Sequence, residues 1–437
     1  MLKQIRELGE IKSIDFDTIR NALYMGYSVD DTALSTRQQA IQGYLKNVIV
    51  YRCINEIVKA ACDIEVVLKL NGEPVDQDGV DPVINLLKRP NTHATFKKFV
   101  RDFLTNYLYS GNAYVLAYDG VNGRRETKVP SKLPAQLYVL NSYEVEVKTP
   151  RNDPYQIERY EHKSDHSGVC YKYPVDALTG LSRIFHYHSY HPLYPNKGLS
   201  PLDPAAYSVD IHNEGSRWNL NLLKNSAAPS GIFSTDESLT DNTVSRLYEM
   251  IKRYFTGSKN SGKAIVLDSG LKFQQLGLSP KEMDFAESLD ITARNIASAF
   301  GVPFALISPE GSTYNNQTDS RMSFYENTVI PLLASSLDEL ALWLSALSGG
   351  DYTFLINQDS ISALEDKRQV KYDRMVDSVN AGILTVDEAR NELGYEPLGG
   401  PASELRTGIN NDVPPSDEEK QAIVKRLTLA YDNAKPA

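Results

Sequence analysis

The chain has 437 residues, 41% of them hydrophobic and 23% charged, which is the composition of a globular protein and excludes global disorder. Its length corresponds to about three domain-sized units. The formal net charge of −10 argues against a protein that grips DNA by its phosphates, since such a grip needs a basic surface. A chain that DNA slides past without sticking, and one with no nucleic-acid role, are both compatible with this charge.

Signals for targeting and for disulfide formation are weak in this sequence. No apolar run approaches the roughly 20 residues that span a bilayer, and the segment after Met1 lacks the apolar core of a signal peptide. Three cysteines, Cys53, Cys62 and Cys170, match neither a disulfide framework nor a zinc pattern. We therefore expect synthesis in a cytoplasm and no membrane partner.

The first part of the chain predicts an arm followed by an α+β domain. Residues 1–40 are polar and weakly patterned, whereas residues 41–200 alternate between the helical and the strand period. Predicted helices run over Asn47–Cys62, Asp81–Leu87 and Phe96–Leu108, the last one closed by Gly111. Predicted strands run over Ile64–Leu70, ended by Asn71-Gly72, and over Ala113–Tyr118 and Leu137–Val147.

The middle of the chain predicts a helix, a small insert and a second helix. The first helix extends from about Asp203 to Asn225, and Ser279-Pro280 opens the second, which Gly301 stops. Between them Pro229-Ser230-Gly231 begins a compact insert. Its predicted elements are strand Ile232–Phe233, helix Asn242–Phe255, strand Ala264–Leu267 and strand Leu271–Leu276.

The last part of the chain predicts more helices. A polar loop over Ser308–Asp319 precedes a third long helix, Ser320–Leu347, in which Pro331 removes a hydrogen bond and predicts a bend. From about Leu364 the chain is helical again, with a capping box at Thr385–Glu388.

Two patterns suggest chemistry but lack the context that the chemistry needs. Gly257–Lys263 has the spacing of a phosphate-binding loop, yet Ala264 replaces the magnesium-binding Ser or Thr, and a helix precedes where a strand is required. His186 and His188 share one face of a predicted strand, but no carboxylate or cysteine lies close in sequence to complete a metal site. We expect no catalytic residue, no metal and no cofactor.

Five short motifs, in order along the chain, resemble those of the portal proteins of tailed double-stranded DNA bacteriophages, the siphovirus-type head-to-tail connectors. They cover about residues 45–400, and the order and spacing of the motifs are more specific than any one of them. In the last motif Asp387 stands where the family more often has Asn. The motifs are Asp81-Pro82-Val83-Ile84-Asn85-Leu86-Leu87-Lys88-Arg89-Pro90-Asn91, Tyr109-Ser110-Gly111-Asn112-Ala113-Tyr114, Tyr194-Pro195-Asn196-Lys197-Gly198-Leu199-Ser200-Pro201-Leu202, Ile296-Ala297-Ser298-Ala299-Phe300-Gly301-Val302-Pro303 and Gly382-Ile383-Leu384-Thr385-Val386-Asp387-Glu388-Ala389-Arg390.

The resemblance implies a ring-forming α+β protein with four named regions. The wing comprises residues 41–200 and 320–360, and the α/β clip comprises residues 229–278. The stem is formed by two helices, 201–228 and 279–301, and residues 302–319 form a loop that projects into the channel. Residues 361–437 form a helical crown and a tail.

The resemblance also implies a function and its partners. Portals form rings, typically of twelve subunits, at one capsid vertex of the virion, where DNA is packaged and ejected. The implied partners are other copies of the chain, the major capsid protein, the terminase large subunit, a head completion or adaptor protein, and double-stranded DNA without sequence specificity.

Particular residues follow from this assignment, each with a plainer alternative. The channel loop would present Glu310, Gly311, Ser312, Asn315, Asn316 and Gln317 to DNA, unless it is an ordinary connecting loop. Near the end of the clip, partner proteins would dock on Lys252, Arg253, Lys259 and Lys263, unless these are solvated surface cations. Two alternatives for the whole chain remain, another structural virion protein such as an adaptor or scaffold, and a nucleotide-dependent motor.

Overall fold

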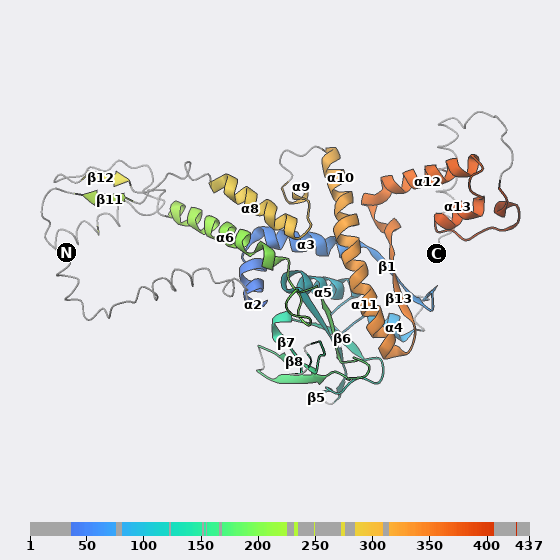
Figure 1. Cartoon of the computed structure of the whole chain (residues 1–437), viewed down its shortest axis with the longest axis horizontal. Coiled ribbons are helices and arrows are strands. Elements are labelled where there is room, and N and C mark those ends of the chain that lie inside the picture. Colours follow the sequence, from blue (N-terminus) through green and yellow to red (C-terminus); the bar gives the residue numbers. More distant parts are fainter. Residues whose placement is uncertain are drawn as a thin grey trace. The chain divides into compact units, whose positions relative to one another are not determined.

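The computed structural model describes residues 36–75, 81–121, 124–150, 153, 155–165, 168–224, 231–234, 249, 272–275, 285–308, 314–405 and 425. The chain divides into two compact units, Met1–Ala363 and Leu364–Ala437. The first unit carries the sheets and most of the helices, and the second carries a pair of helices (Figure 1).

The first unit begins with helices whose ends are set by capping side chains. Asn47 accepts hydrogen bonds from the backbone N–H groups of Ile49 and Val50 and so starts α3, Val48–Asp63. Thr95 starts α5, Phe96–Ser110, which Gly111 ends in the left-handed conformation. These helices confirm the prediction from apolar periodicity. The other helices of this region are α2 (Thr36–Gln38), the π-helix η1 (Gln39–Tyr44) and α4 (Pro82–Lys88).

Three small antiparallel sheets pack with these helices. Their strand orders are β13-β1-β2, β10-β3-β6 and β7-β8-β9. The Asn71-Gly72 turn joins β1 to β2, and both residues have positive φ, as a tight hairpin requires. The strands are β1 (Glu65–Leu70), β2 (Glu73–Pro74), β3 (Asn112–Tyr118), β6 (Gln136–Leu140), β7 (Val145–Lys148), β8 (Arg159–Lys163), β9 (Cys170–Pro174), β10 (Ile184–His188) and β13 (Tyr352–Asn357).

The single strand predicted over Leu137–Val147 is wrong, because the structure contains two. A 3-10 turn, η2 (Ser142–Glu144), separates β6 from β7, and each strand joins a different sheet. Asn106 of α5 accepts hydrogen bonds from both the backbone N–H and the hydroxyl of Ser142, which holds the turn. Apolar alternation continues through this turn, so the sequence pattern does not reveal it.

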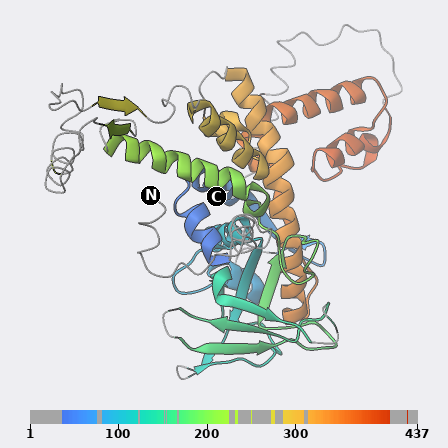
Figure 2. The same cartoon turned by 60° about the vertical axis from the view of Figure 1, so that its left-hand side comes forward.

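Two long helices leave the body of the first unit side by side. They are α6 (Leu202–Lys224) and α8 (Phe285–Ala299), and both views show them running together (Figure 1, Figure 2). Within the insert the structure describes β11 (Gly231–Ser234), paired with β12 (Lys272–Gln275), in agreement with two predicted strands. The predicted helix Asn242–Phe255 and strand Ala264–Leu267 lie almost wholly outside the described residues.

The third long helix begins earlier than predicted. It comprises α10 (Tyr314–Phe324), the π-helical turn η4 (Tyr325–Val329) and α11 (Ile330–Ser348). The predicted loop to Asp319 is therefore wrong over its last six residues. These polar residues form the first part of the helix, and the apolar part follows them in α11. The irregular turn lies directly before Pro331, close to the expected bend.

The helix over residues 316–348 is long and apolar enough to cross a membrane, by length and composition alone. This differs from our expectation, which was based on uninterrupted apolar runs. The helix's stripe of Leu333, Leu337, Leu340 and Leu344 is buried within the first unit, where α11 packs on β13 and β10. The helix therefore serves as a core helix of the fold.

The remaining elements are short helices and strands of the first unit and the helices of the second unit. The short elements of the first unit are α9 (Phe304–Ile307), η5 (Gln358–Ser360), β4 (Gly120–Val121) and β5 (Arg124–Arg125); η6 (Ser362–Leu364) ends at the division. The second unit contains α12 (Glu365–Asn380), α13 (Val386–Glu392) and η7 (Gly400–Ser403). The predicted capping box is present, since Thr385 and Glu388 cap each other's backbone.

Candidate subunit interface

The long helices α6 and α8 are closely packed where they leave the body of the first unit. A Cβ placed on Gly215 of α6 would lie 3.1 Å from Cδ2 of Leu289 on α8, so glycine permits a close approach there. Near the body Ala205, Ala206 and Val209 of α6 and Ala293, Ile296 and Ala297 of α8 are buried. The alanines among them leave room for neighbouring elements to pack closely.

Apolar side chains of the same helices are partly exposed, and the exposed Asp210 and Glu214 share their face of α6. Tyr207 and Ile211 of α6 lie one turn apart and are 57% and 52% exposed, and Ile291 of α8 is 50% exposed. An open groove of about 330 Å³ beside α6 is lined by Val48 of α3 and by polar residues that include His212 and Arg217. Exposed apolar residues grouped in this way mark a protein–protein contact.

Two of the sequence motifs meet at the base of α6. A Cβ on Gly198 would lie only 1.8 Å from the carbonyl oxygen of Gly111, so both positions require glycine. Asn112 completes the junction, because its Oδ1 accepts from the Gly198 N–H at 2.8 Å and lies 3.0 Å from Nε2 of His186. Ser200 donates its hydroxyl to the carbonyl oxygen of Tyr109 at 3.0 Å. These motifs thus fix where α6 starts relative to α5.

A second set of polar side chains joins α6 to the start of the described chain. Gln39 donates to Oδ1 of Asp203 at 2.6 Å, and Asn47 donates to Oδ1 of Asn213 at 3.0 Å. Burial raises the pKa of Asp203, although the bonds from Ser200 and Gln39 oppose that shift. Sequence reasoning missed this network because its partners are more than 160 residues apart.

The end of α8 is tied to the π-helical turn η4. Gly301 has a φ of +68°, and its carbonyl accepts from the hydroxyl of Thr328 at 2.7 Å. Phe300 and Val302 on either side are buried. The motif around Gly301 therefore holds the end of α8 against η4 of the third long helix.

The histidines singled out from the sequence are built into the fold. His186 lies on β10, stacks on Tyr114 with ring centroids 4.3 Å apart, and has its pKa held well below the ordinary value by burial and by His188. Its Nδ1 is buried and has no hydrogen-bond partner within the described structure. Among the described residues no group of three or more His, Cys, Asp and Glu side chains is placed to hold a metal ion.

Several predicted site residues cannot be placed. Glu310, Gly311 and Ser312 lie outside the described residues, as do Lys252, Arg253, Lys259 and Lys263 and the loop that resembles a phosphate-binding loop. Asn315, Asn316 and Gln317 belong to the first turn of α10, so the expected loop placement is wrong for these three amides. Because they belong to a helix, the backbone positions of these three residues are fixed by α10.

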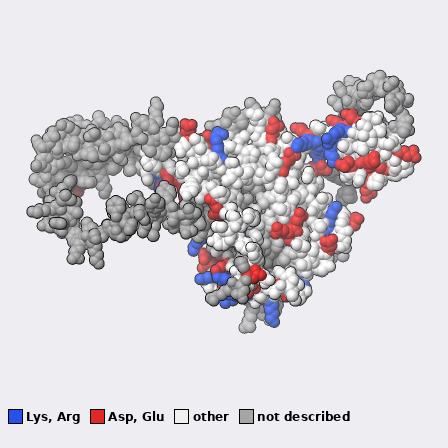
Figure 3. Space-filling model, in the orientation of Figure 1, with Lys and Arg blue, Asp and Glu red and all other residues white. Residues whose placement is uncertain are grey.

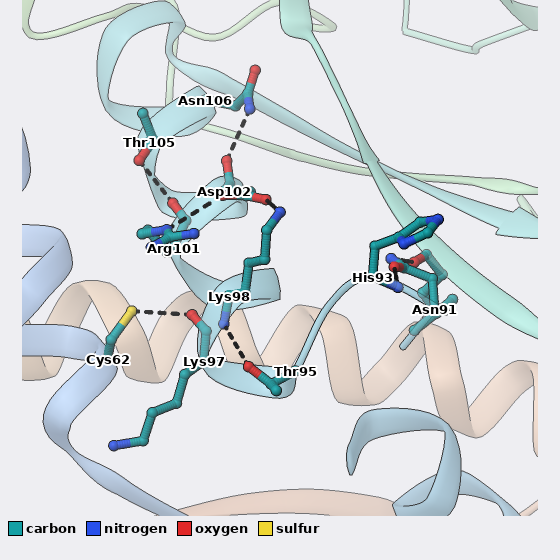
Figure 4. A network of polar contacts seen from close by, with 11 residues as sticks. Cys62, Asn91, His93, Thr95, Lys97, Lys98, Arg101, Asp102, Thr105 and Asn106 are labelled. Carbon is teal, nitrogen blue, oxygen red and sulfur yellow. Dashed lines mark hydrogen bonds and ion pairs between the residues drawn. The ribbon is translucent and has the colours of Figure 1, made fainter. Parts of the chain in front are cut away.

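A cationic cluster that the sequence analysis did not single out lies on α5 (Figure 4). Lys98 and Arg101 both pair with Asp102, at 2.8 and 3.5 Å, and Cys62 of α3 donates to the carbonyl oxygen of Lys97. The ion pairs are solvent-exposed, so each contributes about 0–1 kcal/mol. The cluster therefore contributes little to the stability of the fold, which depends on the buried apolar contacts of α5.

Comparison with protein families gives one match that covers most of the chain. The sequence model of the family described as phage portal protein matches residues 48–394. An uncharacterized protein of Rickettsia bellii is 34% identical over 360 residues, which is 81% of this chain and 88% of that protein. The portal protein of Escherichia phage T5 is 25% identical over 82% of each chain.

Solved structures resemble the chain over a similar extent. A chain from the neck of a native GTA particle, computed with twelvefold symmetry, is 29% identical, with a TM-score of 0.60 over 85% of this chain and 95% of the other. A chain from the virion of a native gene transfer agent particle is 30% identical with the same TM-score.

Proposed function

The chain belongs to the phage portal protein family, and on that basis we propose that it forms the ring at one vertex of a capsid through which DNA is packaged and ejected. Its role is structural and not enzymatic. The ring is an oligomer of this chain, twelvefold as in the related neck, and it resides in the virion after synthesis in a host cytoplasm.

The observation that carries this proposal is the exposure of apolar side chains on the paired helices. Tyr207, Ile211 and Ile291 are each about half exposed in the described part of their own subunit. A neighbour turned by a fixed angle would bury them, and repetition of that heterologous contact closes a ring. The close approach of α6 to α8 at Gly215 lets the two helices act as one unit of such a ring.

The regions of the subunit follow the family arrangement. We assign residues 41–200 and 320–360 to the wing, 201–228 and 279–301 to the stem, 229–278 to the clip and 361–437 to the crown and tail. The channel loop shortens to residues 308–313, because α9 ends at Ile307 and α10 begins at Tyr314. Pro331 lies in the wing, at the point where α11 follows the π-helical turn.

The proposed partners follow from these regions. Clip residues Lys252, Arg253, Lys259 and Lys263 would contact the terminase large subunit during packaging and a head completion or adaptor protein afterwards. The wing would contact the major capsid protein. Double-stranded DNA would pass Glu310, Gly311 and Ser312 without sequence specificity, which an acidic chain favours because like charge lowers adhesion.

Electron microscopy of the purified full chain in negative stain tests the ring directly. We expect annular particles with a central hole, and we expect Ile211→Asp to abolish them because a carboxylate would be buried without a partner. Leu178→Asp is the matched control, since Leu178 is 98% exposed on a loop of the first unit. A chain that stays a monomer at every concentration would overturn the proposal.

A further inference from the structure

The second unit leaves apolar side chains uncovered on one face of α12. Among the described residues of this unit only Leu364 and Ala389 are buried apolar side chains, and α12 has no buried residue. Val370 of α12 and Ile383 after it are 65% and 70% exposed. A unit this small gains little from its own core, so it requires cover from a further segment.

An open groove of about 470 Å³ lies on that face of α12. The hydroxyl groups of Tyr372 and Tyr395 are hydrogen-bonded at 3.0 Å, so the face of α12 that carries Tyr372 is turned toward the chain after α13. The groove lies on the other face, because its lining residues are spaced around the opposite side of the helix. They are Val370, Asp373, Arg374, Asp377, Ser378, Ala381 and Ile383.

One end of the groove is held by the chain reversal after α12. The N–H of Ile383 donates to the carbonyl oxygen of Ser378 at 2.9 Å, and the N–H of Gly382 donates to that of Val379 at 3.1 Å. This pair of bonds is a Schellman motif, and Gly382 supplies its left-handed residue with a φ of +69°. The backbone at Ile383 is therefore ordered before anything docks, which lowers the entropy lost on docking.

Later in the second unit, residues 416–431 have the sequence pattern of a helix. Ser416 and Glu419 have the spacing of a capping box. They follow Pro414-Pro415, and Asp417 would place a carboxylate in the first turn, where the helix dipole favours it. The pattern therefore predicts a helix that begins at Asp417.

The predicted helix is amphipathic. Ile423, Leu427 and Tyr431 recur at i, i+4 and i+8, which places them in one apolar stripe. Lys425 is the residue of this segment that the structure describes, and it is helical and exposed. On a helix Lys425 lies on the side away from the stripe, so its exposure agrees with a stripe that is turned toward a partner surface.

The segment can reach the groove of its own subunit. Residues 406–416 connect it to Leu405, the last described residue before it, and a linker of this length spans up to about 35–40 Å. The 16 residues of α12 are about 24 Å long, so the linker reaches either end of that helix. A tether this short gives the segment an effective concentration on the order of 1 mM at the groove, which a separate chain in dilute solution lacks.

We propose that residues 417–431 dock in the α12 groove of the same subunit, with the stripe of Ile423, Leu427 and Tyr431 covering Val370 and Ile383. The contact lies within one subunit and does not depend on a ring, so the inference goes beyond the proposed function. It gives the second unit the apolar core that α12 and α13 alone lack.

The groove is flanked by side chains of both charges. Asp373 and Asp377 line it together with Arg374, so carboxylates outnumber cations there. Oδ1 of Asp373 accepts a hydrogen bond from Gln369 at 3.2 Å, which keeps this carboxylate at the edge of the groove. Figure 3 shows the same mixture of charges over the described surface of the second unit. A segment that fits must therefore bring cations and a carboxylate beside its apolar stripe.

The segment 417–431 carries such charges. On a helix Lys420 lies one turn before Ile423, while Glu419 and Arg426 border the stripe. The two cations can pair with the two groove carboxylates, and Glu419 can pair with Arg374, which orients the docked helix. These pairs would be exposed, so burial of the apolar stripe supplies most of the stabilisation.

Disulfide trapping tests this docking in the full chain. In a Cys170→Ser background, which removes the exposed native cysteine, Leu427→Cys is combined with Val370→Cys or with Ala381→Cys, so that both ends of the groove are sampled. With at least one pair we expect an intramolecular disulfide, seen as a faster-migrating monomer on a non-reducing gel and as a linked peptide by mass spectrometry. The matched control, Lys425→Cys, has the same tether and should react about tenfold more slowly or less, because its thiol faces away from the groove.

Hydrogen exchange provides a second measurement that needs no cysteine. Leu427→Ala removes most of one stripe side chain and keeps a good helix former, so it should undock the segment without removing its helix propensity. We expect residues 366–383 to exchange about tenfold faster than in the unaltered chain, because α12 then loses its cover. Lys425→Ala is the matched control and should leave that exchange unchanged.

Each failure has a separate meaning. Equal disulfide rates for Leu427→Cys and Lys425→Cys would overturn the docking, and so would exchange of α12 that Leu427→Ala leaves unchanged. Cross-linked dimers in place of the monomeric disulfide would overturn the assignment to the same subunit and give the groove to a second copy. Microscopy judges the proposed ring independently, since rings without the disulfide reject only the docking and the disulfide without rings rejects only the ring.

Discussion

Gly111 and Gly198 bring two segments closer together than any side chain would permit. Gly111 has a φ of +72°, and a Cβ there would lie 2.5 Å from the backbone carbon of Leu199. Gly111→Ala adds a left-handed strain of about 1–2 kcal/mol and an overpacking cost of about 1–3 kcal/mol. We therefore expect the free energy of unfolding to fall by about 2–5 kcal/mol, measured by denaturant unfolding of the monomeric Ile211→Asp variant.

Gly349 provides the matched control for this prediction. It ends α11 as Gly111 ends α5, with a φ of +80°, and no described heavy atom lies within 4 Å of a Cβ built on it. Gly349→Ala should cost only the strain of about 1–2 kcal/mol. Equal losses for the two substitutions would show that the junction with Gly198 relaxes and does not fix α6.

The carboxyl group of Asp387 gives the second unit a defined response to pH. Hydrogen bonds from Ser403, Leu398 and Gly399 lower its pKa below the ordinary value of 3.8. A lowered folded pKa stabilises the loop above the unfolded pKa, and that stabilisation is lost as pH falls through the folded value. We expect the segment 396–404 to stay protected from hydrogen exchange between about pH 5 and 7 and to lose protection only in stronger acid.

Asp387→Asn tests whether the carboxylate is responsible. The amide keeps one accepting oxygen but replaces the other with a donor, so at least one of the three bonds to the loop is lost. Mass spectrometry should show faster exchange in segment 396–404 at neutral pH, and the acid dependence should disappear. Unchanged protection in this variant would mean that Gly399 and Gly400 fix the loop by their backbone geometry alone.

At the scale of elements, the π-helical turn changes what Pro331 does. Proline lacks the N–H that an α-helix interior requires, but Pro331 lies in the first turn of α11, directly after η4. We expect Pro331→Ala to change the free energy of unfolding by less than about 1 kcal/mol. Asp338→Pro, at an exposed position inside α11, should cost about 3 kcal/mol or more. A loss from Pro331→Ala as large as that would mean that the proline itself shapes the helix.

Apolar periodicity correctly predicted the helices and strands whose apolar face is buried against neighbouring elements. The pattern from Phe96 to Leu108 became α5, and the alternation from Ile64 to Leu70 became β1. Capping side chains such as Thr95 and Thr385 also act locally, so their positions could be read from the sequence. In each case the residues that decide the structure lie within one or two turns of each other.

Elements that depend on distant partners were not predictable in the same way. The pairing of β1 with β13 joins residues 282 to 292 positions apart, and the split between β6 and β7 depends on Asn106 of α5. The start of α10 was not predicted because its polar residues show no apolar periodicity. The helix there is an N-terminal extension of α11. The junction of Gly111 with Gly198 is likewise a tertiary contact, although both glycines lay in motifs that the resemblance had identified.

At the scale of the whole molecule, the proposed contact between stems depends on apolar burial. Tyr207 and Ile211 of α6 and Ile291 of α8 are each about half exposed, and their burial against a neighbour is the main gain. The nearby Arg217 and Glu214 already pair with each other within α6. We therefore expect salt to have little effect on this contact.

Raising the salt concentration tests whether the stem contact is apolar. The screening length falls from about 10 Å at 0.1 M to about 3 Å at 1 M, which weakens contacts between exposed charges while apolar burial is retained. We expect negative-stain images to show rings at both salt concentrations. Rings that dissociate as the salt rises would contradict an apolar stem and place the decisive contact among charged residues instead.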